Sequence, residues 1–155
     1  MGKVLTQKNR ESNRSLFMNG DNRNSMAFAH FTLATRDVER TSDFFLQTLG
    51  WQPIDRPANI GRRAAWLLIA PGQEVHLLHV DAFEPSAFEK EFGRHIAFFY
   101  PVSEFDALKR RLVQFGAELI APERSTPFDR FFFKDPNGYV FEIIEAGHAP
   151  EARSH

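Results

Sequence analysis

The chain has 155 residues, of which 43% are hydrophobic and 25% charged, and its formal net charge is −1 at pH 7. This size and balance are typical of one globular domain, or of two closely packed half-domains, with a substantial core. The small net charge argues against nucleic acid as a partner, and no segment is apolar for the length that a membrane span requires. The absence of cysteine excludes disulfides and thiolate metal ligands, which leaves His and carboxylate side chains for any metal ion. We expect a cytoplasmic protein whose partner is a small molecule.

The first 80 residues predict a polar arm followed by a strand, a helix and three further strands. Residues 1–26 are rich in Asn and Arg and lack the apolar segment of a secretory signal, so we expect them to be disordered. Asp37 can cap a helix whose apolar residues recur on one face, and Gly50 is suited to end that helix. The strands of this first unit are predicted over residues 27–34, 51–56, 63–70 and 74–80.

The second unit repeats this order after a connector over residues 81–93, in which we expect a short helix around 86–92. Ser103 and Asp106 resemble a capping box at the start of a helix that ends at Gly116. A turn of Asp, Pro, Asn and Gly over residues 135–138 precedes the last strand. The strands are predicted over residues 94–100, 117–121, 129–134 and 139–145, and residues 147–155 are expected to form a frayed tail.

The two units are copies of one pattern. His30 and His95 open the two first strands and are 65 residues apart, while His76 and Glu142 lie in the two fourth strands and are 66 residues apart. Self-similarity at a fixed period indicates a duplicated supersecondary unit. Each unit, over residues 27–80 and 94–146, has the order βαβββ, and the fold class is α+β. Neither unit can bury a sheet face and a helix stripe alone, so the two should pack together.

The repeat singles out four side chains that commonly bind metal ions: His30, His76, His95 and Glu142. Because side chains alternate across a strand, Glu142 shares its face with two apolar residues. A carboxylate in such surroundings is costly unless it is paired, protonated or bound to a cation. The four side chains therefore predict a site for one divalent ion, and their nitrogen and oxygen donors suit Zn²⁺, Fe²⁺, Ni²⁺, Co²⁺ or Mn²⁺. The alternative is that they are structural, in a chain that has lost its metal.

Three segments around these positions carry a family pattern: His30-Phe-Thr-Leu, Gly93-Arg-His95-Ile-Ala-Phe98 and Asp135-Pro-Asn-Gly138-Tyr-Val-Phe-Glu142. Over about residues 27–146 the chain resembles the vicinal oxygen chelate superfamily, which includes glyoxalase I, bleomycin-resistance proteins and extradiol dioxygenases. The resemblance implies two βαβββ modules that form a cupped, incompletely closed mixed sheet with helices on the outside. It also implies one divalent metal ion and a homodimer. His30, His95 and Glu142 match the usual ligand positions, and His76 matches the fourth.

The resemblance implies a metal-dependent enzyme of glyoxalase type, a lyase or isomerase acting on a small substrate with vicinal oxygens. The ion would stabilise an oxyanion as a Lewis acid, and Glu142 would be both ligand and catalytic residue. Many members carry a carboxylate at the fourth position that also acts as base, whereas this chain has His76 there. Glu74, two residues away on the same predicted face, is a candidate base in its place. Cations near strand ends that could contact an anionic substrate group are Arg62, Arg63, Arg124, Arg130 and Lys134.

Two other functions remain open from the sequence. An Fe(II)-dependent ring-cleavage dioxygenase would use His30 or His76 with His95 and Glu142 as a two-His-one-carboxylate triad. A ligand-sequestering protein of the bleomycin-resistance type would hold its ligand in the same cup without metal chemistry. Against the first, extradiol enzymes generally carry four modules and this chain has two. Against the second, a protein that only binds has no need of these side chains.

Overall fold

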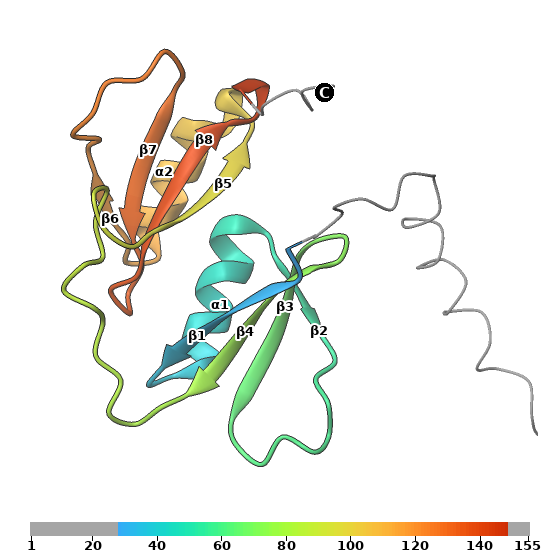
Figure 1. The fold of residues 1–155 in the computed structure, drawn as a ribbon. Coiled ribbons are helices and arrows are strands. Elements are labelled where there is room, and N and C mark those ends of the chain that lie inside the picture. Colours follow the sequence, from blue (N-terminus) through green and yellow to red (C-terminus); the bar gives the residue numbers. More distant parts are fainter. Residues whose placement is uncertain (1–27, 149–155) are drawn as a thin grey trace, which may run out of the picture.

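Residues 28–148 are described by the structure, a computed structural model, and they form two modules with the same order of elements (Figure 1). The expected N-terminal arm and most of the expected tail lie outside these residues. The first module consists of β1 (His30–Thr35), α1 (Val38–Leu49), β2 (Gln52–Ile54), β3 (Ala64–Ala70) and β4 (Gln73–His79). Its sheet has the order β1-β4-β3-β2, with β1 and β4 parallel and the other pairs antiparallel.

The second module repeats this arrangement. It consists of β5 (Ile96–Tyr100), the 3-10 helix η2 (Val102–Glu104), α2 (Phe105–Gln114), β6 (Glu118–Ile120), β7 (Arg130–Lys134), β8 (Val140–Glu145) and the 3-10 helix η3 (Ala146–His148). Its sheet has the order β5-β8-β7-β6, again with the first pair parallel. The expected α+β class, with two βαβββ modules in open mixed sheets, is confirmed.

The connector between the modules differs from the sequence prediction. Within the described residues no helix forms over 86–92, and the segment instead makes turns and an isolated bridge between Glu89 and Arg94. The Ser86 hydroxyl accepts a hydrogen bond from the Phe88 amide, a local contact that competes with helix formation. The Glu89 carboxylate accepts a hydrogen bond from the amide of Val140 in β8. The prediction of a short helix was therefore wrong, because the connector is fastened to the second sheet.

Helix α1 begins and ends where the sequence predicts. The Asp37 side chain accepts a hydrogen bond from the amide of Arg40 at 3.0 Å, as an N-cap residue does. Gly50 follows the helix with a φ of 72°, a left-handed conformation that other residues rarely adopt. Phe44 and Phe45 lie on the buried face of the helix. No helix of the described residues is long and apolar enough to cross a membrane.

The core lies between the helix-bearing faces of the two sheets, where α1 contacts α2. Phe45 is fully buried, with its ring stacked on Trp51 at 4.6 Å and edge-on to Phe141 of β8 at 5.7 Å between centroids. Phe133 of β7 stacks on Phe141 at 5.2 Å. These aromatic contacts join the modules through one apolar interior. The opposite face of each sheet consequently points away from the module junction.

A polar network also joins the modules through the turn before β8. The Tyr139 hydroxyl donates to the carbonyl of Ala34 at 3.0 Å and accepts from the amide of the same residue at 2.9 Å. The Asn137 side chain donates to the Thr41 hydroxyl at 3.1 Å and accepts from the Thr35 hydroxyl at 2.9 Å. The turn of one module is therefore bound to the first strand and the helix of the other.

The buried carboxylate of Asp135 in this turn makes stability depend on pH. Burial raises the pKa of Asp135 from 3.8 to about 6, although the side chain and amide of Asn137 and the amide of Tyr139 donate hydrogen bonds to the carboxylate. The folded state then holds this proton more tightly than the unfolded state. Stability is therefore lost as the pH rises from about 4 to about 6. Between about pH 4 and about pH 6 we expect the free energy of unfolding to fall by about 2 kcal/mol relative to that of Asp135→Asn.

Urea unfolding of both proteins at several pH values measures this difference. Other titrating groups are common to the two proteins, so they cancel when the free energies are subtracted. A difference that stays constant across the window would show that burial does not raise this pKa.

Candidate functional site

The predicted ligands of the first module lie next to each other on the outer face of its sheet. The parallel register of β1 and β4 places His30 opposite Glu74 and Thr32 opposite His76. The rings of His30 and His76 stack with centroids 4.1 Å apart, and His76 also stacks on Trp66 of β3 at 4.3 Å. These two stacks hold the His76 ring in place, while His30 remains exposed.

Glu74 contacts this pair directly. Its Oε2 accepts a hydrogen bond from Nε2 of His76 at 2.9 Å, and 35% of its side chain is exposed. A carboxylate that accepts from one imidazole nitrogen orients the ring and makes the other nitrogen a better metal ligand. The structure therefore places Glu74 on the same face as His76, as the sequence predicts, and within reach of solvent.

The predicted ligands of the second module form another pair. Nε2 of His95 lies 3.4 Å from Oε2 of Glu142, and the side chain of Glu142 is 9% exposed. Phe141 and Ile143, on either side of Glu142 in β8, point into the core, which leaves Glu142 on the outer face. The ring of Phe132 meets the His95 ring edge-on at 5.3 Å. The strand alternation predicted from the sequence thus places His95 and Glu142 together.

Glu142 also has an arginine partner. Its Oε1 accepts a hydrogen bond from Nη1 of Arg130 at 2.7 Å, and the Arg130 side chain is only 2% exposed. Nη2 of Arg130 donates to Glu91 and, at 2.7 Å, to the carbonyl of Arg124. Burial opposes the charge of Arg130, but the hydrogen bonds and charges of Glu142 and Glu91 raise its pKa above the ordinary value. The burial of Glu142 therefore has an internal counterion and does not by itself require a metal ion.

The four predicted ligands thus form two half-sites, one on each module. The first half-site is His30 and His76, with Glu74 beside them, and the second is His95 and Glu142. Across residues 28–148, no three His, Asp or Glu side chains are grouped so that they could hold one metal ion. One chain therefore supplies two pairs of donors, and the sequence leaves open whether one chain or two complete each site.

Both half-sites lie by uncovered edge strands. Among residues 28–148, β1 and β5 each pair with one neighbouring strand and form an edge of their sheets. Phe99, on the same face of β5 as Ala97 and in line with His95, is 51% exposed, and Thr32 of β1 is exposed next to His30. An open strand edge presents unpaired backbone groups that another chain could pair with.

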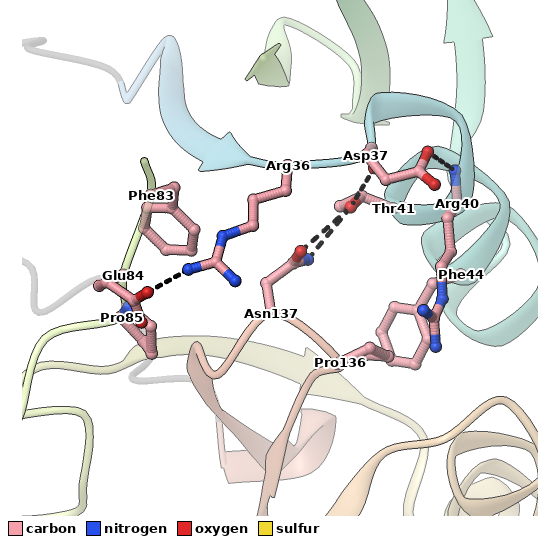
Figure 2. Close-up of a pocket in the computed structure, with 10 residues that line it drawn as sticks. All are labelled: Arg36, Asp37, Arg40, Thr41, Phe44, Phe83, Glu84, Pro85, Pro136 and Asn137. Carbon is pink, nitrogen blue, oxygen red and sulfur yellow. Dashed lines mark hydrogen bonds and ion pairs between the residues drawn. The ribbon is translucent and has the colours of Figure 1, made fainter. Parts of the chain in front are cut away.

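A separate pocket lies at the module junction (Figure 2). A cavity of about 250 Å³ is bounded by the start of α1, the connector and the turn before β8. Several of its polar groups already have partners, since Arg36 pairs with Glu84 and the Asp37 side chain accepts from the amide of Arg40. The predicted metal ligands do not line this cavity. The pocket belongs to the contact between the modules and not to either half-site.

The cations that the sequence places near strand ends have different surroundings. Lys134 pairs with Glu118 of the neighbouring strand at 3.4 Å, whereas Arg130 reaches Glu142. The antiparallel register of β7 and β8 places Arg130 diagonally across from Glu142 on one face, so this contact could have been predicted from the strand pattern. Sequence reasoning missed Glu91, because nothing in the connector indicates that it folds back onto this sheet.

Comparison with known proteins supports the duplicated architecture. A model of the glyoxalase/bleomycin resistance protein/dioxygenase superfamily matches residues 27–143. The protein Glyoxylase I 4 of Arabidopsis thaliana is 28% identical over 129 residues, which cover 78% of this chain and 71% of the plant protein.

Solved structures with the same fold include fosfomycin resistance proteins. FosX from Mesorhizobium loti matches with a TM-score of 0.61 and 21% identity, covering 77% of this chain and 90% of that one. A variant of FosX from Listeria monocytogenes was solved as a complex with Mn(II) and 1S,2S-dihydroxypropylphosphonic acid. It matches with a TM-score of 0.62 and 22% identity, and the match covers 78% of this chain and 90% of that one. At these identities the structures show a shared fold alone, whereas the family model spans both modules. This chain belongs to the glyoxalase/bleomycin resistance protein/dioxygenase superfamily.

Proposed function

We propose that this protein is a metal-dependent enzyme of glyoxalase type, a lyase or isomerase acting on a small substrate with two neighbouring oxygen atoms. The observation that carries the proposal is the pair of half-sites, which place imidazole and carboxylate donors at matching positions of a duplicated module. The similarity to Glyoxylase I 4 supports an enzyme. The complex of a FosX protein with Mn(II) supports a divalent ion.

The donor set fits such an ion. His30, His76 and His95 supply imidazole nitrogen and Glu142 supplies carboxylate oxygen, a combination without sulfur that suits Zn²⁺, Fe²⁺, Ni²⁺, Co²⁺ or Mn²⁺. Each half-site has two donors, fewer than the roughly three protein ligands that a catalytic zinc site retains. We therefore propose that the first half-site of one chain faces the second half-site of another copy. A two-fold pairing would create two equal sites and cover the edge strands β1 and β5.

When bound, the ion supplies Lewis-acid stabilisation of the negative charge that develops on the substrate oxygens. Glu74 acts as the base: its carboxylate takes the proton from the carbon beside the carbonyl, and the C–H electron pair moves toward the carbonyl oxygen. Return of that proton to the former carbonyl carbon, while the hydroxyl proton of the first carbon passes to the former carbonyl oxygen, completes an isomerisation without a change in overall oxidation state. The hydrogen bond from Nε2 of His76 holds Glu74 in place and leaves Nδ1 of His76 for the ion.

Metal analysis and proton exchange test this proposal. Tag-free protein is expected to retain one divalent ion per chain and, in deuterated water, to exchange the proton on the α-carbon of an α-oxoaldehyde–thiol adduct. Glu74→Gln should slow this exchange by about 100-fold or more, since a general base contributes about that much, when both proteins are assayed with the divalent ion in excess so that the weaker support of His76 does not leave the site empty. Glu84→Gln, at an exposed carboxylate, is the matched control.

Two results would contradict the proposal. Full metal content without exchange, together with oxygen uptake on a catechol, would favour the dioxygenase. Stoichiometric binding of a ligand by protein that takes up no ion would favour sequestration.

A further inference from the structure

We infer that Arg130, held by Glu91 of the connector, positions the Glu142 carboxylate so that one of its oxygens is left for the metal ion. The inference rests on the proposed metal site. It assigns Arg130 and Glu91 as positioning residues, which act through Glu142 and do not contact the ion or the substrate.

The two oxygens of Glu142 have different neighbours. Oε1 accepts the hydrogen bond from Nη1 of Arg130 at 2.7 Å, while Oε2 lies 3.4 Å from Nε2 of His95. The bond to Oε1 joins two opposite charges and is of the stronger kind. Ligation through both oxygens would draw electron density from Oε1 and weaken this bond. The arrangement therefore selects Oε2, on the His95 side, as the single oxygen that binds the ion.

Arg130 is itself fixed in position. Its guanidinium stacks over the ring of Phe132 at 5.1 Å, and Nη2 donates to Glu91 and to the Arg124 carbonyl. Nε of Arg130 is buried and has no hydrogen-bond partner among the described residues. Within these residues, the guanidinium is therefore oriented by the hydrogen bonds of Nη1 and Nη2. Arg130 thus spans two carboxylates with its two terminal nitrogens, a geometry that suits the planar fork of arginine.

Glu91 is built into the same arrangement. Its side chain is 6% exposed, and its other oxygen accepts a hydrogen bond from the amide of Glu123. Burial works against the charge, but the hydrogen bonds from Arg130 and the Glu123 amide lower the pKa of Glu91. Glu91 stays ionised and cancels the charge of Arg130. An ion at Glu142 is then next to a neutral pair and not to an unbalanced arginine.

Arg130→Lys is the first test, because it keeps the charge and removes the fork. A single ammonium cannot span both carboxylates in the arginine geometry. We expect the affinity for Co²⁺, measured by titration calorimetry, to fall about 10–100-fold, the range typical of groups that orient a metal ligand. The Co²⁺ absorption spectrum should change as well. Arg110→Lys, the same change at an exposed arginine of α2 away from both carboxylates, should leave both unchanged.

The double variant Glu91→Gln and Arg130→Gln distinguishes an effect of the orientation of Glu142 from an effect of net charge. It has the same net charge as the wild type, since one negative and one positive group are removed together. If the pair orients Glu142, the affinity for Co²⁺ should again fall about 10-fold or more. Glu91→Gln alone is the milder change, and it reports on the same arrangement if the double variant does not fold.

The outcomes separate this inference from the proposed function. The positioning role is overturned if Arg130→Lys and the folded Glu91 variant bind Co²⁺ with the same affinity as the wild type. That result would leave the proposed metal site intact. Wild-type protein that binds no divalent ion overturns both. A merely structural role would lower the unfolding temperature of the metal-free protein without changing the affinity or the Co²⁺ spectrum of the folded protein.

Discussion

Glu142→Gln is expected to lower the affinity for a divalent ion by at least about 100-fold, which exceeds the effect of changing a group that only orients a ligand. The substitution keeps the shape of the side chain and an oxygen that can accept from Arg130, but it removes the negative charge beside His95. A carboxylate ligand contributes through that charge, whereas an amide oxygen contributes only a dipole. Titration of the metal-free protein with Zn²⁺ or Co²⁺ measures the change.

The matched control lies in the same strand. Glu145→Gln makes the identical change three residues away, at a carboxylate that accepts a hydrogen bond from the amide of Asp129 at 3.2 Å. Alternation along β8 places Glu145 on the face opposite to Glu142. Equal losses in the two variants would mean that ion binding reflects general negative charge and not a site.

Phe45→Ala is expected to destabilise the fold by about 3–5 kcal/mol, the usual cost of truncating a large buried aromatic side chain. Phe45 is 0% exposed and contacts Trp51 of its own module and Phe141 of the other. Few neighbours can move into the space, since it lies between two packed sheets. Chemical denaturation followed by Trp fluorescence and by circular dichroism gives the free energy of unfolding.

The same substitution at the surface is the control for this effect. Phe88→Ala removes an aromatic side chain that is 67% exposed in the connector, and it should change stability by no more than about 0.5 kcal/mol. If Phe45→Ala were as mild as Phe88→Ala, the two modules would not share one cooperative core.

The repeat in the sequence predicted most of the fold because each module obeys local rules. Asp37 and Gly50 bound the first helix through a side-chain cap and a left-handed residue, both of which depend on nearby backbone. Side chains alternate between the two faces of a strand, so Glu142 and Phe141 point to opposite faces of β8. The position of Glu142 on the outer face could therefore be inferred from this two-residue repeat alone. Such features need no knowledge of distant contacts.

The arrangement of the site depended on contacts that are distant in the sequence. The sequence could not show that the four predicted ligands lie in two pairs, because this depends on the packing of the helix-bearing faces, which turns the outer faces apart. The partnership of Glu142 with Arg130 follows from the pairing of β7 with β8 and could have been predicted. The contact between Glu91 and Arg130 could not be predicted. It depends on the path of the connector, whose sequence has no periodic pattern.

Complementation between two defective chains tests whether the metal site forms across two copies of the chain. One chain carries His30→Ala and His76→Ala, and the other carries His95→Ala and Glu142→Gln, so each lacks one half-site and neither should bind an ion alone. In a mixed pair, the intact first half-site of one chain would face the intact second half-site of the other. Refolding the two chains together at equal amounts should then restore about a quarter of the wild-type number of sites, because about half of the pairs are mixed and each has one complete site.

If each site is shared between two copies, that fraction is recovered, measured as bound Zn²⁺ per chain after gel filtration. Mixtures that bind no more Zn²⁺ than the separate chains, although the wild type refolded in the same way binds one ion per chain, would contradict this sharing. The metal site would then have to be completed within one chain.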